Sequence, residues 1–206
     1  MTDVASYAPS WRVGPLPVGS VEKRGVGWWG VLSLIATEGA LFGYLLFSYY
    51  YFAAQLPKGW NPDPHPTIML SGPDTAVLLL SSVFVWQGER GVKAGSRLRA
   101  LGGLGGGILL GVIFLVVQYF EWKSKHFSIR SGPYGSLFYT ITGFHMIHVF
   151  VGVIALSFAL LWSALGYFDR VRHSAISIVA IYWHFVDAVW IFIFSTFYLS
   201  PLVIGK

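Results

Sequence analysis

The residues from Ile176 to Leu199 are almost all apolar, and the run is long enough to cross a bilayer as one helix. Within this run, His184 and Asp187 stand three positions apart, so they share one face of the helix. A carboxylate at membrane depth is costly unless it is paired, protonated or hydrated. We therefore expect these two side chains to have a structural or functional role.

Four further apolar runs precede this one, so the sequence predicts an all-α integral membrane protein, a bundle of five transmembrane helices. Within a transmembrane domain of residues 27–200, the predicted helices cover about residues 27–54, 68–88, 100–121, 136–165 and 175–199. Pro57, Pro62, Pro64 and Pro66 separate the first two helices, and Pro73 falls in the first turns of the second. Residues 1–26 are predicted to be a cytoplasmic N-terminal segment and residues 201–206 a C-terminal tail.

Composition supports a membrane protein. Of the 206 residues, 55% are hydrophobic and only 11% are charged, whereas soluble domains carry about 25% charged residues. The chain has no cysteine, which excludes disulfides, thiolate catalysis and iron–sulfur ligation. The first 25 residues are polar and lack an apolar core, so we expect no signal peptide.

The basic residues predict topology rather than binding to nucleic acid, because they cluster in short connections between apolar runs. Nine lie on the side of the N-terminus and five on the opposite side. We therefore expect a multi-pass protein of the bacterial inner membrane, with its N-terminus in the cytoplasm and its C-terminus outside. The nine are Arg12, Lys23, Arg24, Arg90, Lys93, Arg97, Arg99, Arg170 and Arg172, and the five are Lys58, Lys123, Lys125, Arg130 and Lys206.

The third predicted helix opens with the glycine-rich stretch Leu101-Gly-Gly-Leu-Gly-Gly-Gly107, and Gly111 follows one turn later. Glycine at this density allows another helix or an acyl chain to approach closely. A nucleotide-binding loop does not fit, because no strand precedes the stretch and no lysine follows it in the helix. The sequence therefore predicts close helix packing here.

Seven polar side chains within the predicted helices are candidate site residues. Glu38 lies about midway along the first helix. Gln118 and Glu121 lie at the end of the third helix, close to the membrane interface, where a carboxylate is less costly. The full set is Glu38, Gln118, Glu121, His145, His148, His184 and Asp187.

Three interpretations of this set remain open from the residues alone. The side chains can be interhelical hydrogen-bonding groups, each worth about 0.6 kcal/mol on average. Chains of Asp, Glu and His also mark proton relays in membranes. His145 or His148, together with His184, could instead hold a metal or a haem, although their neighbours Phe, Met, Ile and Val offer few second-shell acceptors.

Six short motifs follow one another between about Trp28 and Leu199. They are the Glu-Gly-x-x-x-Gly-like run at Glu38, Leu78-Leu-Leu-Ser-Ser82, Gln118-Tyr-Phe-Glu121, Tyr134-Gly-Ser136, Thr142-Gly-Phe-His-Met-Ile-His-Val149 and Tyr182-Trp-His-Phe-Val-Asp-Ala-Val-Trp190. In this order they resemble subunit III of the haem–copper respiratory oxidases, and the last motif is the most specific. The departures, such as Met146 where the family often has glycine and Ala188 where valine is common, involve no titratable group.

The resemblance implies a non-catalytic, non-redox subunit of a cytochrome c oxidase in its five-helix form. Such a subunit packs on subunit I, which holds the haems and copper, while subunit II of a cytochrome c oxidase holds further copper. The chain itself would then have no catalytic residue and no metal ligand. Glu38 would line a cleft that holds structural phospholipid, and the subunit would support oxygen access and proton uptake.

The partners implied are subunits I and II and phospholipids, with a small subunit IV and a respiratory supercomplex as further candidates and no nucleic acid. Three other functions stay open at this point. Two keep the family: subunit III of a quinol oxidase, and a relative associated with nitric oxide reductases. The third is an autonomous proton or ion transporter, against which the lack of an internal inverted repeat argues.

Overall fold

A computed structural model describes residues 25–56, 60 and 68–201 of the chain. The predictions for the N-terminal segment and for most of the C-terminal tail fall outside these residues. The helices are α1 (Val26–Gln55), α2 (Ile68–Lys93), α3 (Arg97–Ser124), α4 (Pro133–Ala164) and α5 (Ser174–Phe194), followed by a π-helical turn, η2 (Ser195–Leu199). Each of the five, with η2 joined to α5, is long and apolar enough to cross a membrane. The predicted fold class is confirmed.

With η2 joined to α5, the helix ends lie within three residues of the predicted ones except at the end of α2, and two of the differences have local reasons. α2 continues five residues beyond Gly88, to Lys93, and Lys93 forms an ion pair with Glu89 one turn earlier. Gly95, with φ 70°, then ends the helix, and the amides of Gly95 and Ser96 donate to carbonyls of its last turn. α4 begins at Pro133 rather than at residue 136, because proline is favoured in the first helical turn.

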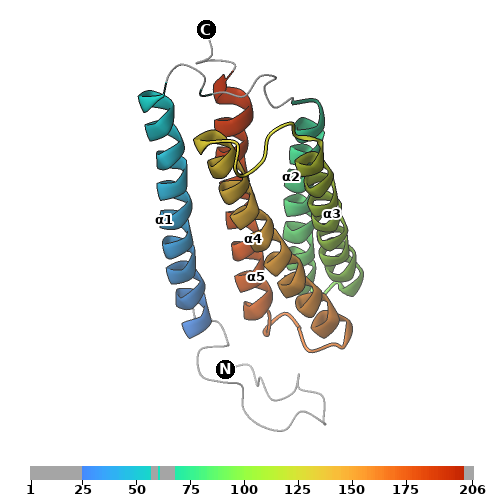
Figure 1. Ribbon diagram of the computed structural model, residues 1–206. Helices are drawn as coiled ribbons and strands as arrows, with labels where there is room; N and C mark the ends of the chain where they lie inside the picture. Colours follow the sequence, from blue (N-terminus) through green and yellow to red (C-terminus); the bar gives the residue numbers. More distant parts are fainter. Residues whose placement is uncertain (1–24, 57–59, 61–67, 202–206) are drawn as a thin grey trace.

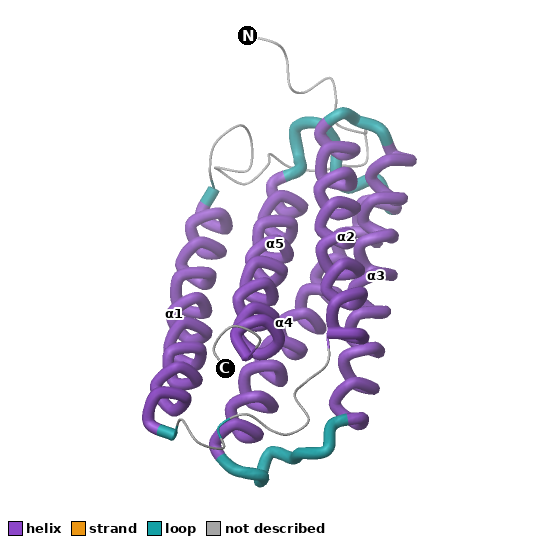
Figure 2. Tube along the Cα trace, turned by 90° about the horizontal axis from the view of Figure 1, so that it is seen from above, coloured by secondary structure: helices purple, strands orange, loops and turns teal. Residues whose placement is uncertain are grey.

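The helices form an antiparallel bundle with α1 at one side (Figure 1). α2 and α3 lie side by side at the opposite side in both views (Figures 1 and 2) and make the most extensive contact between any two helices. α5 contacts α1, α2 and α4, whereas α1 contacts only α4 and α5 extensively within the described residues. The α2–α3 turn and the α4–α5 connection lie at the same end of the bundle (Figure 1).

Glycines bring the backbones of α2 and α3 together. A Cβ atom on Gly88 would lie 2.8 Å from the backbone nitrogen of Leu104, and one on Gly103 would collide with the backbone of Gly88. Gly107 makes room for the side chain of Val85, whereas Gly102 faces open space. The close packing predicted from the glycine-rich stretch is therefore confirmed for the face of α3 that meets α2.

Trp183 of α5 is the centre of the core, fully buried where four helices meet. Cβ atoms on Gly111 of α3 and Gly152 of α4 would lie 2.6 and 2.8 Å from its ring. Its indole nitrogen donates a hydrogen bond of 3.0 Å to Ser81 Oγ of α2. The two glycines thus make room for a side chain that links α5 to three other helices.

The π-helical turn η2 directs two polar side chains to different helices. Thr196 Oγ1 lies 3.1 Å from the hydroxyl of Tyr50 in α1, and the hydroxyl of Tyr198 donates to Glu121 in α3 at 2.7 Å. Single π-helical turns often occur at functional positions. Here the turn attaches the end of α5 to both sides of the bundle.

Candidate functional site

Glu38 of α1 and His148 of α4 form a polar pair inside the membrane-spanning region. Glu38 Oε2 lies 3.1 Å from His148 Nε2, and His148 Nδ1 lies 2.7 Å from the carbonyl oxygen of Phe144. Because a carbonyl only accepts, Nδ1 carries a hydrogen. Nε2 then either accepts from a protonated Glu38 or, in the doubly protonated ring, donates to the carboxylate. The pair is the main polar connection between α1 and α4.

Glu38 is the most accessible carboxyl among the candidates described, with 26% of its side chain exposed. Hydrophobic carbodiimides react with protonated carboxyl groups in apolar settings, so we expect Glu38→Gln to remove most carbodiimide labelling while leaving the fold intact. Asp74→Asn is the matched control, because Asp74 is almost completely buried and its loss should leave labelling unchanged. Equal labelling of the wild type and Glu38→Gln, measured by peptide mass spectrometry, would show this expectation to be wrong.

His184 and Asp187 both bind Ser82, across the interface between α5 and α2. The hydroxyl of Ser82 donates to Asp187 Oδ2 and lies 2.9 Å from His184 Nδ1. Since its single hydrogen goes to Asp187, Ser82 accepts from Nδ1–H of His184. The predicted common face of His184 and Asp187 is confirmed, and the serine on α2 is their shared partner.

Two further hydrogen bonds extend this α2–α5 contact in both directions. Trp190 Nε1 donates to Thr75 Oγ1 at 2.9 Å, and Ser177 Oγ donates to Glu89 Oε1 at 2.6 Å. The α2 partners Thr75, Ser82 and Glu89 are spaced seven residues apart, which places them on one helical stripe. Polar side chains therefore fix the rotation of α5 against α2 along most of the membrane span.

Glu121 joins three elements near the other end of the bundle. Its Oε1 accepts hydrogen bonds from Tyr198 at 2.7 Å, from Lys125 at 2.7 Å and from Ser71 at 3.2 Å. The side chain is almost completely buried, with Lys125 as its counter-charge. We expected Glu121 close to the interface, where a carboxylate is less costly, and in the structure protein donors solvate it.

Gln118 and Asp74 are buried one turn deeper, on the facing sides of α3 and α2. The contacts Ser71–Glu121 and Val85–Gly107 set the register of the two antiparallel helices, and this register puts Asp74 opposite Gln118. Within the described residues, neither side chain has a hydrogen-bond partner. A carboxyl and a carboxamide at this depth require water or each other as partners.

His145 packs as an aromatic group. Its ring is fully buried and stacks on Trp190 at 4.9 Å between ring centroids, with Phe114 edge-on at 5.9 Å. Neither ring nitrogen finds a hydrogen-bond partner among the described residues. His145 and His148 thus have different surroundings although they share a helix face.

The seven candidate residues do not form one site in the structure. Glu38 pairs with His148, His184 with Asp187 through Ser82, and Gln118 lies near Glu121, while His145 stands apart in the aromatic core. Among the residues that the structure describes, no group of three or more His, Asp or Glu side chains is arranged to hold a metal ion.

Asp74, Lys125 and the α2 partners Ser71, Thr75, Ser82 and Glu89 were not among the predicted site residues. Asp74 follows Pro73 in the first turns of the predicted second helix, and in the structure it is buried within α2. The sequence does contain one signal for the α2 partners. Thr75, Ser82 and Glu89 are spaced seven residues apart, which marks a polar stripe on an otherwise apolar helix.

The fold and these sites define a class: a polytopic helical membrane protein whose ionisable groups mostly bond to side chains on other helices. The chain belongs to the cytochrome c oxidase subunit III family, whose model matches residues 20–201. The family prediction, made from the motifs above, is confirmed.

Several curated relatives support this family membership. Cytochrome c oxidase subunit 3 of Scyliorhinus canicula is 40% identical over 143 residues, which are 69% of this chain and 54% of the relative. The proteins of the same name from Danio rerio and Osphranter robustus are 34% and 32% identical over 82% and 86% of this chain, and over 68% and 70% of their own lengths. The chain thus spans between about half and about two thirds of the length of these relatives.

Proposed function

We propose that this protein is the non-redox third subunit of a respiratory cytochrome c oxidase, packed on the subunit that carries the haems and copper. The match of the family model over nearly the whole described chain is the observation that supports it most strongly. The relatives compared above are named as cytochrome c oxidase subunits, which favours cytochrome c over quinol as the donor to the complex.

In this proposal the intramembrane polar groups hold the bundle together and ligate no metal. Glu38–His148, Ser82 with His184 and Asp187, and the Glu121 cluster each join two or more helices, which supports a structural role. The haems and copper would reside in the partner subunits, and this chain would supply no catalytic residue. Its contribution would be to oxygen access and to sustained proton uptake through subunit I.

Glu38 is proposed to face structural phospholipid. Its side chain is about a quarter exposed although Glu38 lies near the middle of α1, and α1 is the helix with the fewest contacts to the rest of the bundle. A partly exposed polar pair at this depth needs a polar environment or a headgroup nearby.

The proposed location is the bacterial inner membrane, with the N-terminus in the cytoplasm. Within the described residues, six cations lie at the end of the bundle where α1 begins, against three at the opposite end, and this bias supports the orientation. The six are Arg90, Lys93, Arg97, Arg99, Arg170 and Arg172, and the three are Lys123, Lys125 and Arg130.

Affinity purification of the tagged chain in mild detergent tests the proposed function. We expect it to copurify with a membrane subunit that contains haem and copper and a second that contains copper, and with oxygen-reducing activity when reduced cytochrome c is supplied. Purification of the chain without a haem–copper protein would contradict the proposal.

Asp187→Leu should weaken retention of the subunit in this complex. The substitution leaves the Ser82 hydroxyl, which also accepts from His184, without its own acceptor. A stranded buried polar group costs about 1–3 kcal/mol. Asp187→Asn keeps an acceptor oxygen and serves as the control. After a graded detergent wash, we expect Asp187→Leu to be lost first and Asp187→Asn to behave like the wild type; equal retention of all three would count against a structural role.

A further inference from the structure

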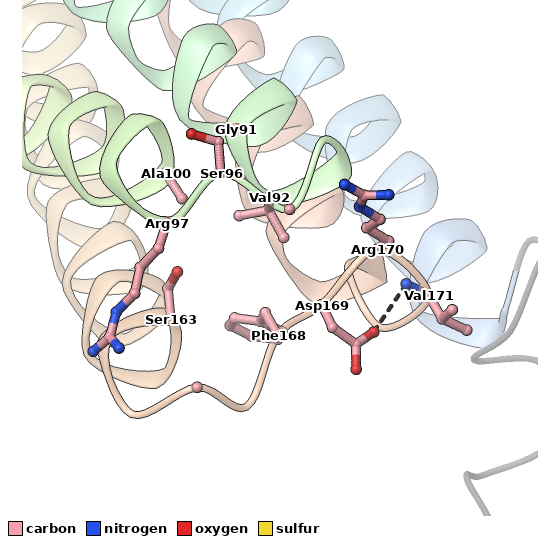
Figure 3. Close-up of a pocket in the computed structure, with 12 residues that line it drawn as sticks. Gly91, Val92, Ser96, Arg97, Ala100, Ser163, Phe168, Asp169, Arg170 and Val171 are labelled. Atoms are coloured by element: carbon pink, nitrogen blue, oxygen red, sulfur yellow. Dashed lines mark hydrogen bonds between the residues drawn. The ribbon is translucent and has the colours of Figure 1, made fainter. Parts of the chain in front are cut away.

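A pocket of about 610 Å³ lies between the α2–α3 turn and the α4–α5 connection, at the opposite end of the bundle from Glu121. Figure 3 shows its lining: Arg97 and Arg170 lie on opposite sides, with Val92 and Phe168 between them. Ala100 and Val171 add further apolar surface. The pocket therefore combines an apolar wall with two permanent positive charges.

Within the described residues, no carboxylate neutralises the two arginines. Among the described residues, neither Arg97 nor Arg170 forms an ion pair with a carboxylate, and Arg97 donates one hydrogen bond of 2.7 Å to the carbonyl oxygen of Ala164. Arg170 reaches across to the α2–α3 turn, where a Cβ on Gly95 would lie 2.6 Å from its Nε. A guanidinium has five N–H donors, so both groups keep donors for a ligand.

Asp169 is the acid in the pocket lining, and its carboxylate bonds to the residues that follow it in the sequence. Oδ1 accepts hydrogen bonds from the amides of Val171 and Arg172 at 2.9 and 2.7 Å, and Oδ2 lies 3.9 Å from Arg172 Nε. The carboxylate thus shapes the α4–α5 connection instead of pairing with Arg97 or Arg170.

The surroundings of the pocket are positive and lie at the membrane surface. Of the charged residues described at this end, six are cations and two, Glu89 and Asp169, are acids. Large apolar side chains beside the pocket are exposed, among them Leu98 at 85% and Leu165 at 58%. Exposed apolar groups next to arginines at the end of a membrane-spanning bundle are typical of the headgroup layer.

We propose that this pocket binds the phosphate-bearing headgroup of an anionic phospholipid. Arg97 and Arg170 supply the counter-charges, and α3, which begins at Arg97, adds the positive end of its helix dipole. The apolar wall suits the glycerol and upper acyl region of a lipid better than an acidic protein segment. The site is separate from Glu38, which lies mid-helix in α1, and it does not depend on the proposed oxidase function.

The test uses the full chain, purified in detergent, with native mass spectrometry to measure bound dioleoyl phosphatidylglycerol and dioleoyl phosphatidylcholine. Each cation near an anionic lipid surface contributes enough to shift affinity about fivefold. We expect phosphatidylglycerol to bind in preference to phosphatidylcholine, and Arg170→Gln to weaken its binding about fivefold. Arg130→Gln, at the opposite end of the bundle, should leave binding unchanged.

Arg97→Gln should weaken binding by a similar factor, but it also removes the hydrogen bond to Ala164, so Arg170→Gln carries the test. Equal binding of the two lipids, or no effect of Arg170→Gln, would overturn the proposal. Inorganic phosphate alone displacing the lipid would reassign the pocket to a free anion. Preferential binding of an acidic peptide would reassign it to a protein partner, and either result would overturn the lipid assignment.

Discussion

Gly103→Leu is expected to separate α2 from α3 and to destabilise the bundle by about 3 kcal/mol or more, the upper end of the cost of overpacking. The physical reason is that a side chain on Gly103 collides with the backbone of Gly88. A side chain could relieve such a collision by changing its rotamer, but a helix backbone cannot. Because α2–α3 is the most extensive helix contact, the loss should spread to the polar bonds that α2 makes with α5.

Gly102→Leu is the matched control. It places the same side chain one residue away on the same helix, where nothing lies within 4 Å. Unfolding of the two variants by SDS titration in detergent micelles should show a large loss for Gly103→Leu and a small change for Gly102→Leu. Similar stability of both would mean that α2 and α3 do not meet at Gly88 and Gly103.

Trp183→Ala should cost about 3–5 kcal/mol, the range for removing a fully buried large aromatic side chain. The indole fills the space that Gly111 and Gly152 leave open, and it donates to Ser81. Its removal leaves a cavity between four helices and a serine hydroxyl without one of its partners.

Trp29→Ala is the control for Trp183→Ala, because Trp29 is 59% exposed on α1. Thermal unfolding of the purified protein, followed by circular dichroism, should show a clearly lower midpoint for Trp183→Ala. The partial rescue expected from Gly152→Ala in the Trp183→Ala background would add direct evidence, because the alanine methyl group would enter the cavity. A midpoint for Trp183→Ala equal to that of Trp29→Ala would contradict the central position of Trp183.

The five helices could be predicted from the sequence because spanning a bilayer needs only a long apolar run, which is a local property. The same holds for the shared face of His184 and Asp187, which follows from helical spacing alone. The glycine-rich start of α3 predicted close packing, but only the structure shows that Gly103 faces α2 and Gly102 does not.

The partners of the polar side chains could not be predicted, because they come from other helices. Nothing local to Ser82 indicates that it binds His184 and Asp187, and nothing near Glu121 points to Tyr198, which lies 77 positions away. The π-helical turn that carries Tyr198 has no strong sequence signal either. The pocket at Arg97 and Arg170 likewise forms only when two connections, distant in sequence, meet at one end of the bundle.

The structural role of the intramembrane side chains is tested most directly by releasing this chain from the purified complex with stronger detergent. The metal content and the visible absorption of each fraction are then measured. If the intramembrane side chains serve as links between helices, haem and copper should stay entirely with the partner subunits, and the released chain should show no Soret band. Iron or copper that remains bound to the released chain, and is lost on His148→Leu or His184→Leu, would contradict this structural role.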